Sequence, residues 1–189
     1  MQNPAKEIVD VVRGLVEKPT FERQAAVLRK YFTEDVEFTH YYINTTGGVK
    51  DLIAIYNIAE CLVSYQSVEF QKITYDKQAN ALTLRLSVFV RPLHFLPLSA
   101  LKFLVLLELE DHKIEGGRTV KKIKVQRDYF ERAPLLTLIP IIGPLYESDM
   151  IRNVLGSLLA ATFDVLKQGF DVLKQTFDVL KQESLKKVS

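Results

Sequence analysis

His40 is a candidate in this sequence for proton transfer. General acid–base chemistry needs a carboxylate or an imidazole whose pKa is tuned by an apolar cavity. His40 follows Val36 and Phe38 at a spacing of two residues, which on a strand places all three on one face. We expect that face to point towards helices. His40 is therefore predicted inside, either as an acid or base or as a hydrogen-bonded interior histidine.

The strand predicted over residues 119–130 places the other polar groups. Its apolar Ile123 alternates with lysines, and an inward Ile123 predicts that Arg127 and Tyr129 also point inward while Asp128 points to solvent. The predicted interior then contains no carboxylate base. The residues predicted to contact a ligand, with His40 as the candidate catalytic residue, are His40, Tyr42, Tyr56, Val88, Arg127 and Tyr129.

Other chemical signatures are missing from the sequence. His94 and His112 share no spacing with His40 that would build a three-histidine site, so no metal and no cofactor are expected. The single Cys61 excludes an intramolecular disulfide and is expected to be a small core residue. There is no glycine-rich phosphate loop and no signature of a serine or cysteine nucleophile.

The spacing of apolar residues predicts the elements that hold these groups. Two amphipathic helices come first, with Pro4 in the first turn of one and Thr20 as the N-cap of the other. A strand over residues 36–43, a third helix after Gly48, and four strands in hairpin order from residue 64 to 130 follow. Antiparallel strands with helices on one face predict an α+β fold rather than a parallel dinucleotide-binding sheet.

The same residues carry a family resemblance. The helix and strand order, with YFTEDVEFTHYY, GGVKDLIAIYNIAE and VQRDYFE, resembles the nuclear-transport-factor-2-like (SnoaL-like) fold. Three segments are similar to its SigF-like branch, known mostly from fungi: NPAKEIVDVVRGLVE, RKYFTEDVEFTH and IYNIAECL. The resemblance covers about residues 1–132. It implies helices packed on a curved antiparallel sheet that forms a cone, often with an apolar pocket.

The resemblance leaves the activity open. The wider family includes isomerases, cyclases, dehydratases and non-catalytic binding modules, and members of the narrower branch often carry a membrane-associating C-terminal segment. Because a fold hosts many functions, the site must be argued from its own residues.

The C-terminal region repeats the sequence FDVLKQ three times, over residues 163–168, 170–175 and 177–182. On a helix, the Phe, Val and Leu of each repeat form one wide apolar arc opposite a charge-balanced face. We expect an apolar linker over 133–147, which is broken by three prolines, and an amphipathic helix over 148–189. The residues predicted to contact lipid are Leu135, Leu136, Ile139, Ile141, Ile142, Phe163, Leu166, Phe170, Leu173, Phe177 and Leu180.

This helix has three possible partners: a lipid surface, a second copy of the chain, or its own cone. Bulky phenylalanines on a wide arc favour a lipid surface. The longest uncharged stretch, residues 133–146, falls short of the roughly 20 residues that span a bilayer, so a peripheral rather than a spanning protein is expected.

Charge and hydropathy narrow the classes of partner. A net charge of +2 argues against nucleic acid, although residues 118–132 hold six basic and two acidic residues. That basic strand is either a patch for anionic headgroups or the solvated face of an edge or outer strand. A mean hydropathy of +0.05 is high for a chain without a spanning segment.

The sequence as a whole predicts a non-catalytic protein that binds a hydrophobic small molecule, associates with a lipid surface, or does both. Its expected location is cytoplasmic, on endoplasmic-reticulum membrane or lipid droplets. The alternatives are an isomerase, cyclase or dehydratase acting on a lipophilic molecule, and a homodimeric scaffold.

Overall fold

A computed structural model of the chain describes residues 1–114, 117–131, 139, 142–151, 153–154 and 156–158. The chain divides into two units, Met1–Pro140 and Ile141–Ser189, and each is described by itself. The described residues of the first unit form three α-helices and a six-stranded sheet.

The three helices form where apolar periodicity and capping predict them. α1 (Pro4–Val16) has its proline in the first turn, and Thr20 caps α2 (Phe21–Tyr31) by accepting the Arg23 N–H through its Oγ1 at 3.2 Å. α3 (Gly48–Val63) ends where Ser64 takes a left-handed conformation. Cys61 is exposed on α3, so its predicted place in the core is wrong. The inward face of α3 is formed by other residues, among them Leu52, Ile55 and Tyr56.

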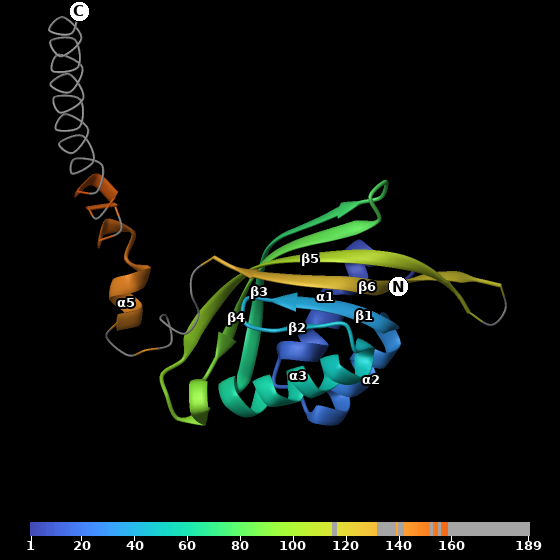
Figure 1. Cartoon of the computed structure of the whole chain (residues 1–189), viewed down its shortest axis with the longest axis horizontal. Helices are drawn as coiled ribbons and strands as arrows, with labels where there is room; N and C mark the ends of the chain where they lie inside the picture. Colours follow the sequence, from blue (N-terminus) through green and yellow to red (C-terminus); the bar gives the residue numbers. More distant parts are fainter. Residues whose placement is uncertain (115–116, 132–138, 140–141, 152, 155, 159–189) are drawn as a thin grey trace, which may run out of the picture. The chain divides into compact units, whose positions relative to one another are not determined.

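The sheet bends around the helices, which lie on one of its faces (Figure 1). Its strand order is β2-β1-β6-β5-β4-β3. β1 pairs in parallel with β6, and the other neighbours are antiparallel. The strands are β1 (Phe32–His40), β2 (Asn44–Thr45), β3 (Tyr65–Asp76), β4 (Ala81–Val90), β5 (Ser99–Lys113) and β6 (Thr119–Phe130), with a short 3-10 turn, η1 (Pro92–His94), before β5.

The core lies between the helices and the inner face of the sheet. Alternate residues of β4, from Leu82 to Val90, are buried, which confirms the predicted inward face of that strand. Gln24 is also fully buried, and its Nε2 donates to the Leu15 carbonyl at 2.8 Å, which ties α2 to α1. The α+β fold and the cone are therefore confirmed.

A β-bulge interrupts β6 beside β5. Leu109 pairs with Ile123 and Glu108 with Val125, so Lys124 has no partner across the ladder. A bulge inserts one residue into one strand and reverses the alternation beyond it. Before the bulge the odd-numbered Ile123 points inward. After it, the even-numbered residues Gln126, Asp128 and Phe130 point inward instead.

The second unit begins with α5 (Ile142–Glu147). This six-residue helix lies inside the predicted linker, and Pro144 fits its third position because the first turn of a helix needs no proline N–H. Ser148 follows, and its Oγ accepts the Ile151 N–H at 3.4 Å, as an N-cap side chain does at the start of a helix. The FDVLKQ repeats lie outside the described residues, so the linker and helix boundaries remain predictions.

Candidate functional site

A cavity of about 310 Å³ lies inside the cone. α1 and α3 form one wall, and the inner faces of the sheet strands form the other. Its surface is almost entirely apolar, with contributions that include Leu15, Phe38, Leu84, Val88 and Val105. Clefts of this size and character typically hold small hydrophobic molecules.

The polar groups of the wall gather around Asp128 on β6. The Nε2 of Gln126, two residues earlier on the same face, lies 2.9 and 3.0 Å from the two carboxyl oxygens of Asp128. The same Nε2 donates to the Tyr56 hydroxyl of α3 at 3.1 Å. Tyr65, at the start of β3, also lines the cavity. A carboxyl, an amide and two phenols thus share one part of an apolar wall.

Burial shifts the pKa values of these groups. Burial raises the pKa of Asp128 to about 7, although the hydrogen bond from Gln126 opposes part of this shift. Burial also raises the pKa of Tyr56 well above its usual value, and the neighbouring charge of Asp128 raises it further. Near neutral pH, Asp128 therefore exists in both protonated and ionised forms, while Tyr56 keeps its proton.

His40 lies in the cavity wall, as the sequence predicts. It pairs in register with Asp128 across the parallel β1–β6 ladder, and its ring meets the Phe130 ring edge-on at 4.9 Å. Burial lowers the pKa of His40, so the ring is neutral at pH 7. Its Nδ1 lies 3.4 Å from the Tyr42 N–H. The role of His40 as an acid or base stays a prediction.

The structure corrects the predicted orientation of three β6 residues. Arg127 lies on the outer face of the sheet, where its Nη1 donates to Glu108, and Tyr129 is 48% exposed. Asp128, predicted to face solvent, lines the cavity. The bulge at Lys124 reverses the alternation between these residues and Ile123. The predicted inward orientation of Arg127 and Tyr129 is therefore wrong, and neither side chain lines the cavity.

The other predicted ligand-contact residues do line the cavity: His40, Tyr42, Tyr56 and Val88. Sequence reasoning missed Tyr65, Gln126 and Asp128. One signal was available, because Gln126, Asp128 and the apolar Phe130 alternate in a register of their own. That register conflicts with the one set by Ile123, and such a conflict within one strand is what a bulge resolves.

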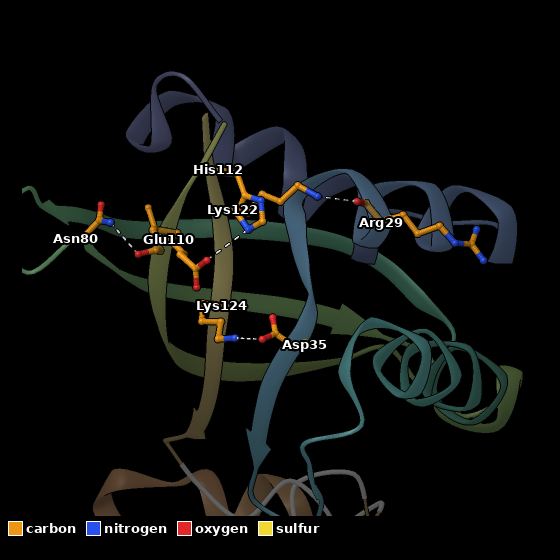
Figure 2. A network of polar contacts seen from close by, with 8 residues as sticks. Arg29, Asp35, Asn80, Glu110, His112, Lys122 and Lys124 are labelled. Atoms are coloured by element: carbon orange, nitrogen blue, oxygen red, sulfur yellow. Dashed lines mark hydrogen bonds and ion pairs between the residues drawn. The ribbon is translucent and has the colours of Figure 1, made fainter. Parts of the chain in front are cut away.

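The basic residues of β6 belong to an interior strand of the sheet, not to an edge. Figure 2 shows Lys124 directed at Asp35 of β1, with which it forms an ion pair, and Lys122 donating to the Arg29 carbonyl of α2 at 3.4 Å. Further along the strand, Lys121 pairs with Asp111 at 2.7 Å. Carboxylates thus neutralise Lys121 and Lys124 of the predicted basic patch, and Lys122 is held by a hydrogen bond to a carbonyl.

Of the residues predicted to contact lipid, two are described, and both Ile139 and Ile142 are exposed. Leu135, Leu136, Ile141 and the six repeat residues from Phe163 to Leu180 lie outside the described residues. None of the described helices is long and apolar enough to span a bilayer. In the same part of the chain, no three His, Cys, Asp or Glu side chains cluster as a metal site would require.

Comparisons with known proteins agree with this architecture. A protein from Catenulispora acidiphila with a ketosteroid isomerase-like fold, solved with trimethylamine, is 14% identical, with 71% of this chain and 92% of that chain covered and a TM-score of 0.53. A putative SnoaL-like polyketide cyclase from Jannaschia is 12% identical, with 76% and 96% covered and a TM-score of 0.51. A putative scytalone dehydratase from Novosphingobium aromaticivorans is 18% identical, with 67% and 80% covered and a TM-score of 0.50.

These likenesses show the fold alone. No curated protein matches the chain. The family model of the SigF NTF2-like domain matches residues 1–168, which extends the resemblance beyond the cone and into the first FDVLKQ repeat. The chain therefore belongs to the SigF branch of the nuclear-transport-factor-2-like family.

Proposed function

We propose that the protein binds a lipophilic small molecule in the cone cavity. The observation that carries this proposal is the cavity itself, about 310 Å³ in volume and lined by apolar side chains except around Asp128. A close-packed core normally leaves few voids larger than a water molecule. Burying the apolar surface of a ligand there contributes about 25 cal/mol per Å².

Filling the cavity tests this proposal. Val88 is 4% exposed and lines the cavity from the middle of β4. Val88→Trp should weaken binding of pyrene, a neutral hydrocarbon probe, at least about tenfold, because the indole takes the space of the probe (about 1.4 kcal/mol). Pyrene emission, which reports the polarity around the probe, measures the affinity.

Leu104→Trp is the matched control, because Leu104 lies on the outer face of the sheet and is exposed. This variant should bind pyrene as the unaltered chain does. A Val88→Trp protein that has a native circular dichroism spectrum and binds pyrene normally would contradict the proposal.

We further propose that the ligand is taken from a lipid surface. Four residues that line the cavity are also exposed: Tyr42, Ile43, Ile58 and Leu62. The cavity thus opens between apolar side chains of α3 and of the turn after β1. The FDVLKQ repeats supply a second apolar surface in the sequence, with phenylalanine at the same position of each repeat.

Two single substitutions in the full chain test the lipid proposal. Phe170→Asp places a charge on the apolar arc of the repeats and should reduce flotation with phosphatidylcholine vesicles by at least about half, because apolar burial drives such binding. Gln175→Asp adds the same charge to the polar face and should leave flotation unchanged. Equal flotation of the two variants would contradict a lipid-bound apolar arc.

Catalysis by an isomerase, cyclase or dehydratase and homodimer formation both stay predictions. For the first, Asp128 supplies the carboxylate that the predicted interior lacked.

A further inference from the structure

Asp128 is a carboxyl group in an apolar wall without a positive partner. Its one hydrogen-bond partner among the described residues is the neutral amide of Gln126. A carboxylate in apolar surroundings is costly unless a positive charge pairs with it. No described basic side chain therefore compensates the charge of this ionisable group.

The basic side chains nearest along β6 are engaged elsewhere. Arg127 pairs with Glu108 on the outer face of the sheet, and Lys124 pairs with Asp35 (Figure 2). Arg85 of β4 pairs with Glu131 at 2.9 Å. None of these side chains lines the cavity. Among the described residues no basic side chain is placed to pair with Asp128, so a positive charge there would be supplied by a ligand.

Aromatic rings surround the approach to Asp128 within the cavity. Phe130 follows Asp128 on the same face of β6, and its ring lies 4.3 Å from that of Phe103 and 4.9 Å from that of His40. Tyr56 and Tyr65 line the same cavity. Ring faces attract cations, and the attraction is stronger in a desolvated site. An ammonium group fits a wall of this kind better than a carboxylate does.

We propose that the cavity binds lipophilic amines, with the protonated nitrogen against the Asp128 carboxylate and the hydrocarbon part along the apolar wall. This inference rests on the proposed binding function and narrows its ligand class. The protonated nitrogen pairs with the carboxylate charge that no described side chain of the cone pairs. The alkyl part occupies the space between α1 and β4.

The preference of the cavity for a protonated amine should depend on pH, because protonation removes the charge of Asp128. The titratable groups that face it are His40 on β1, Tyr56 on α3 and Tyr65 on β3, while α1 and β5 contribute apolar side chains to the cavity. Burial keeps the ring of His40 neutral and both phenols protonated at pH 7. Amine affinity should therefore rise between pH 5 and pH 8, as Asp128 ionises with a pKa of about 7.

Calorimetric titration of the full chain with octylamine, octanol and octanoate tests the inference, because the three differ only in the head group. At pH 8, octylamine should bind at least about tenfold more tightly than octanol, as expected for a charge-assisted hydrogen bond. At pH 5 the preference should disappear. Asp128→Asn should remove the preference at both values, whereas Asp35→Asn, a matched change on the outer face, should retain it.

The outcomes separate this inference from the binding proposal. Equal binding of octylamine and octanol at pH 8, or tighter binding of octanoate, overturns the amine inference and leaves the binding proposal intact. If none of the three ligands binds, both fail. The pH series on the unaltered chain decides the matter even if Asp128→Asn does not fold.

Discussion

The Asp128→Asn variant should gain stability relative to the unaltered chain as the pH rises from 4 to 8. Burial raises the pKa of Asp128 in the folded cone to about 7, whereas in the unfolded chain it is about 3.9. Between these values the unfolded chain releases a proton that the folded chain keeps. The free energy of unfolding of the unaltered chain therefore falls with rising pH through this group, and asparagine removes that dependence.

The expected size of the effect is up to about 4 kcal/mol, because each unit of pKa difference corresponds to about 1.4 kcal/mol. The effect should be complete just above pH 7 and absent at pH 4. Urea unfolding at intervals of one pH unit, followed by far-ultraviolet circular dichroism because the chain has no tryptophan, measures it.

Asp35→Asn is the control for this experiment. The hydrogen bond from Lys124 lowers the pKa of Asp35, so its contribution has the opposite sign. That variant should be less stable than the unaltered chain above about pH 5, with a difference that stays constant up to about pH 8 and shrinks only as the pH falls below about 4. A difference between Asp128→Asn and the unaltered chain that stays constant from pH 4 to 8 would show that Asp128 is solvated in the folded state.

Gly48→Ala should be the most damaging glycine substitution in the cone. Gly48 begins α3 with a φ of +76°, and a Cβ there would lie 2.1 Å from the Glu34 carbonyl oxygen of β1. The obstacle is backbone, so the strand or the helix must move. We expect a loss of about 3 kcal/mol or more, the sum of left-handed strain and the displaced packing of α3.

Gly117→Ala measures the cost of left-handed backbone strain without a clash between the new Cβ and another part of the chain. Gly117 has the same φ of +76°, but a Cβ there would meet no atom within 4 Å. Its substitution should cost only the left-handed strain, about 1 kcal/mol. Urea unfolding of both variants at one pH gives the comparison. Equal losses would mean that the approach of α3 to β1 does not constrain the fold.

The close approach at Gly48 also explains why the position of Tyr56 could not be derived from the sequence alone. The apolar stripe of α3 predicts correctly that Tyr56 faces inward. The distance from Tyr56 to Gln126 depends on how closely the start of α3 approaches β1, and that approach requires a residue without a side chain. In the sequence, Gly47 and Gly48 indicate only that the strand pattern ends and a helix follows.

The sequence predicts α1, α2, α3, the five longer strands and most of their inward faces. Local rules were enough, because helix periodicity, caps such as Thr20 and strand alternation act within a few residues. For the same reason the inward face of β4 and the place of His40 were predicted correctly. The family resemblance of the segments from Asn3 to Leu62 was likewise carried by residues close in sequence.

The set of polar side chains that line the cavity together, His40, Tyr56 and Asp128, depends on the tertiary structure. At Lys124 the register of β6 shifts against both of its neighbours, β5 and β1, which are far from it in sequence or joined to it only through the folded sheet. Strand alternation can indicate that two registers conflict within the strand, but it does not locate the bulge between them. A single register set by Ile123 therefore places Arg127 inside and Asp128 outside. The same pairing draws the basic side chains to acids on the outer face and leaves Asp128 in the cavity without a positive partner among the described residues.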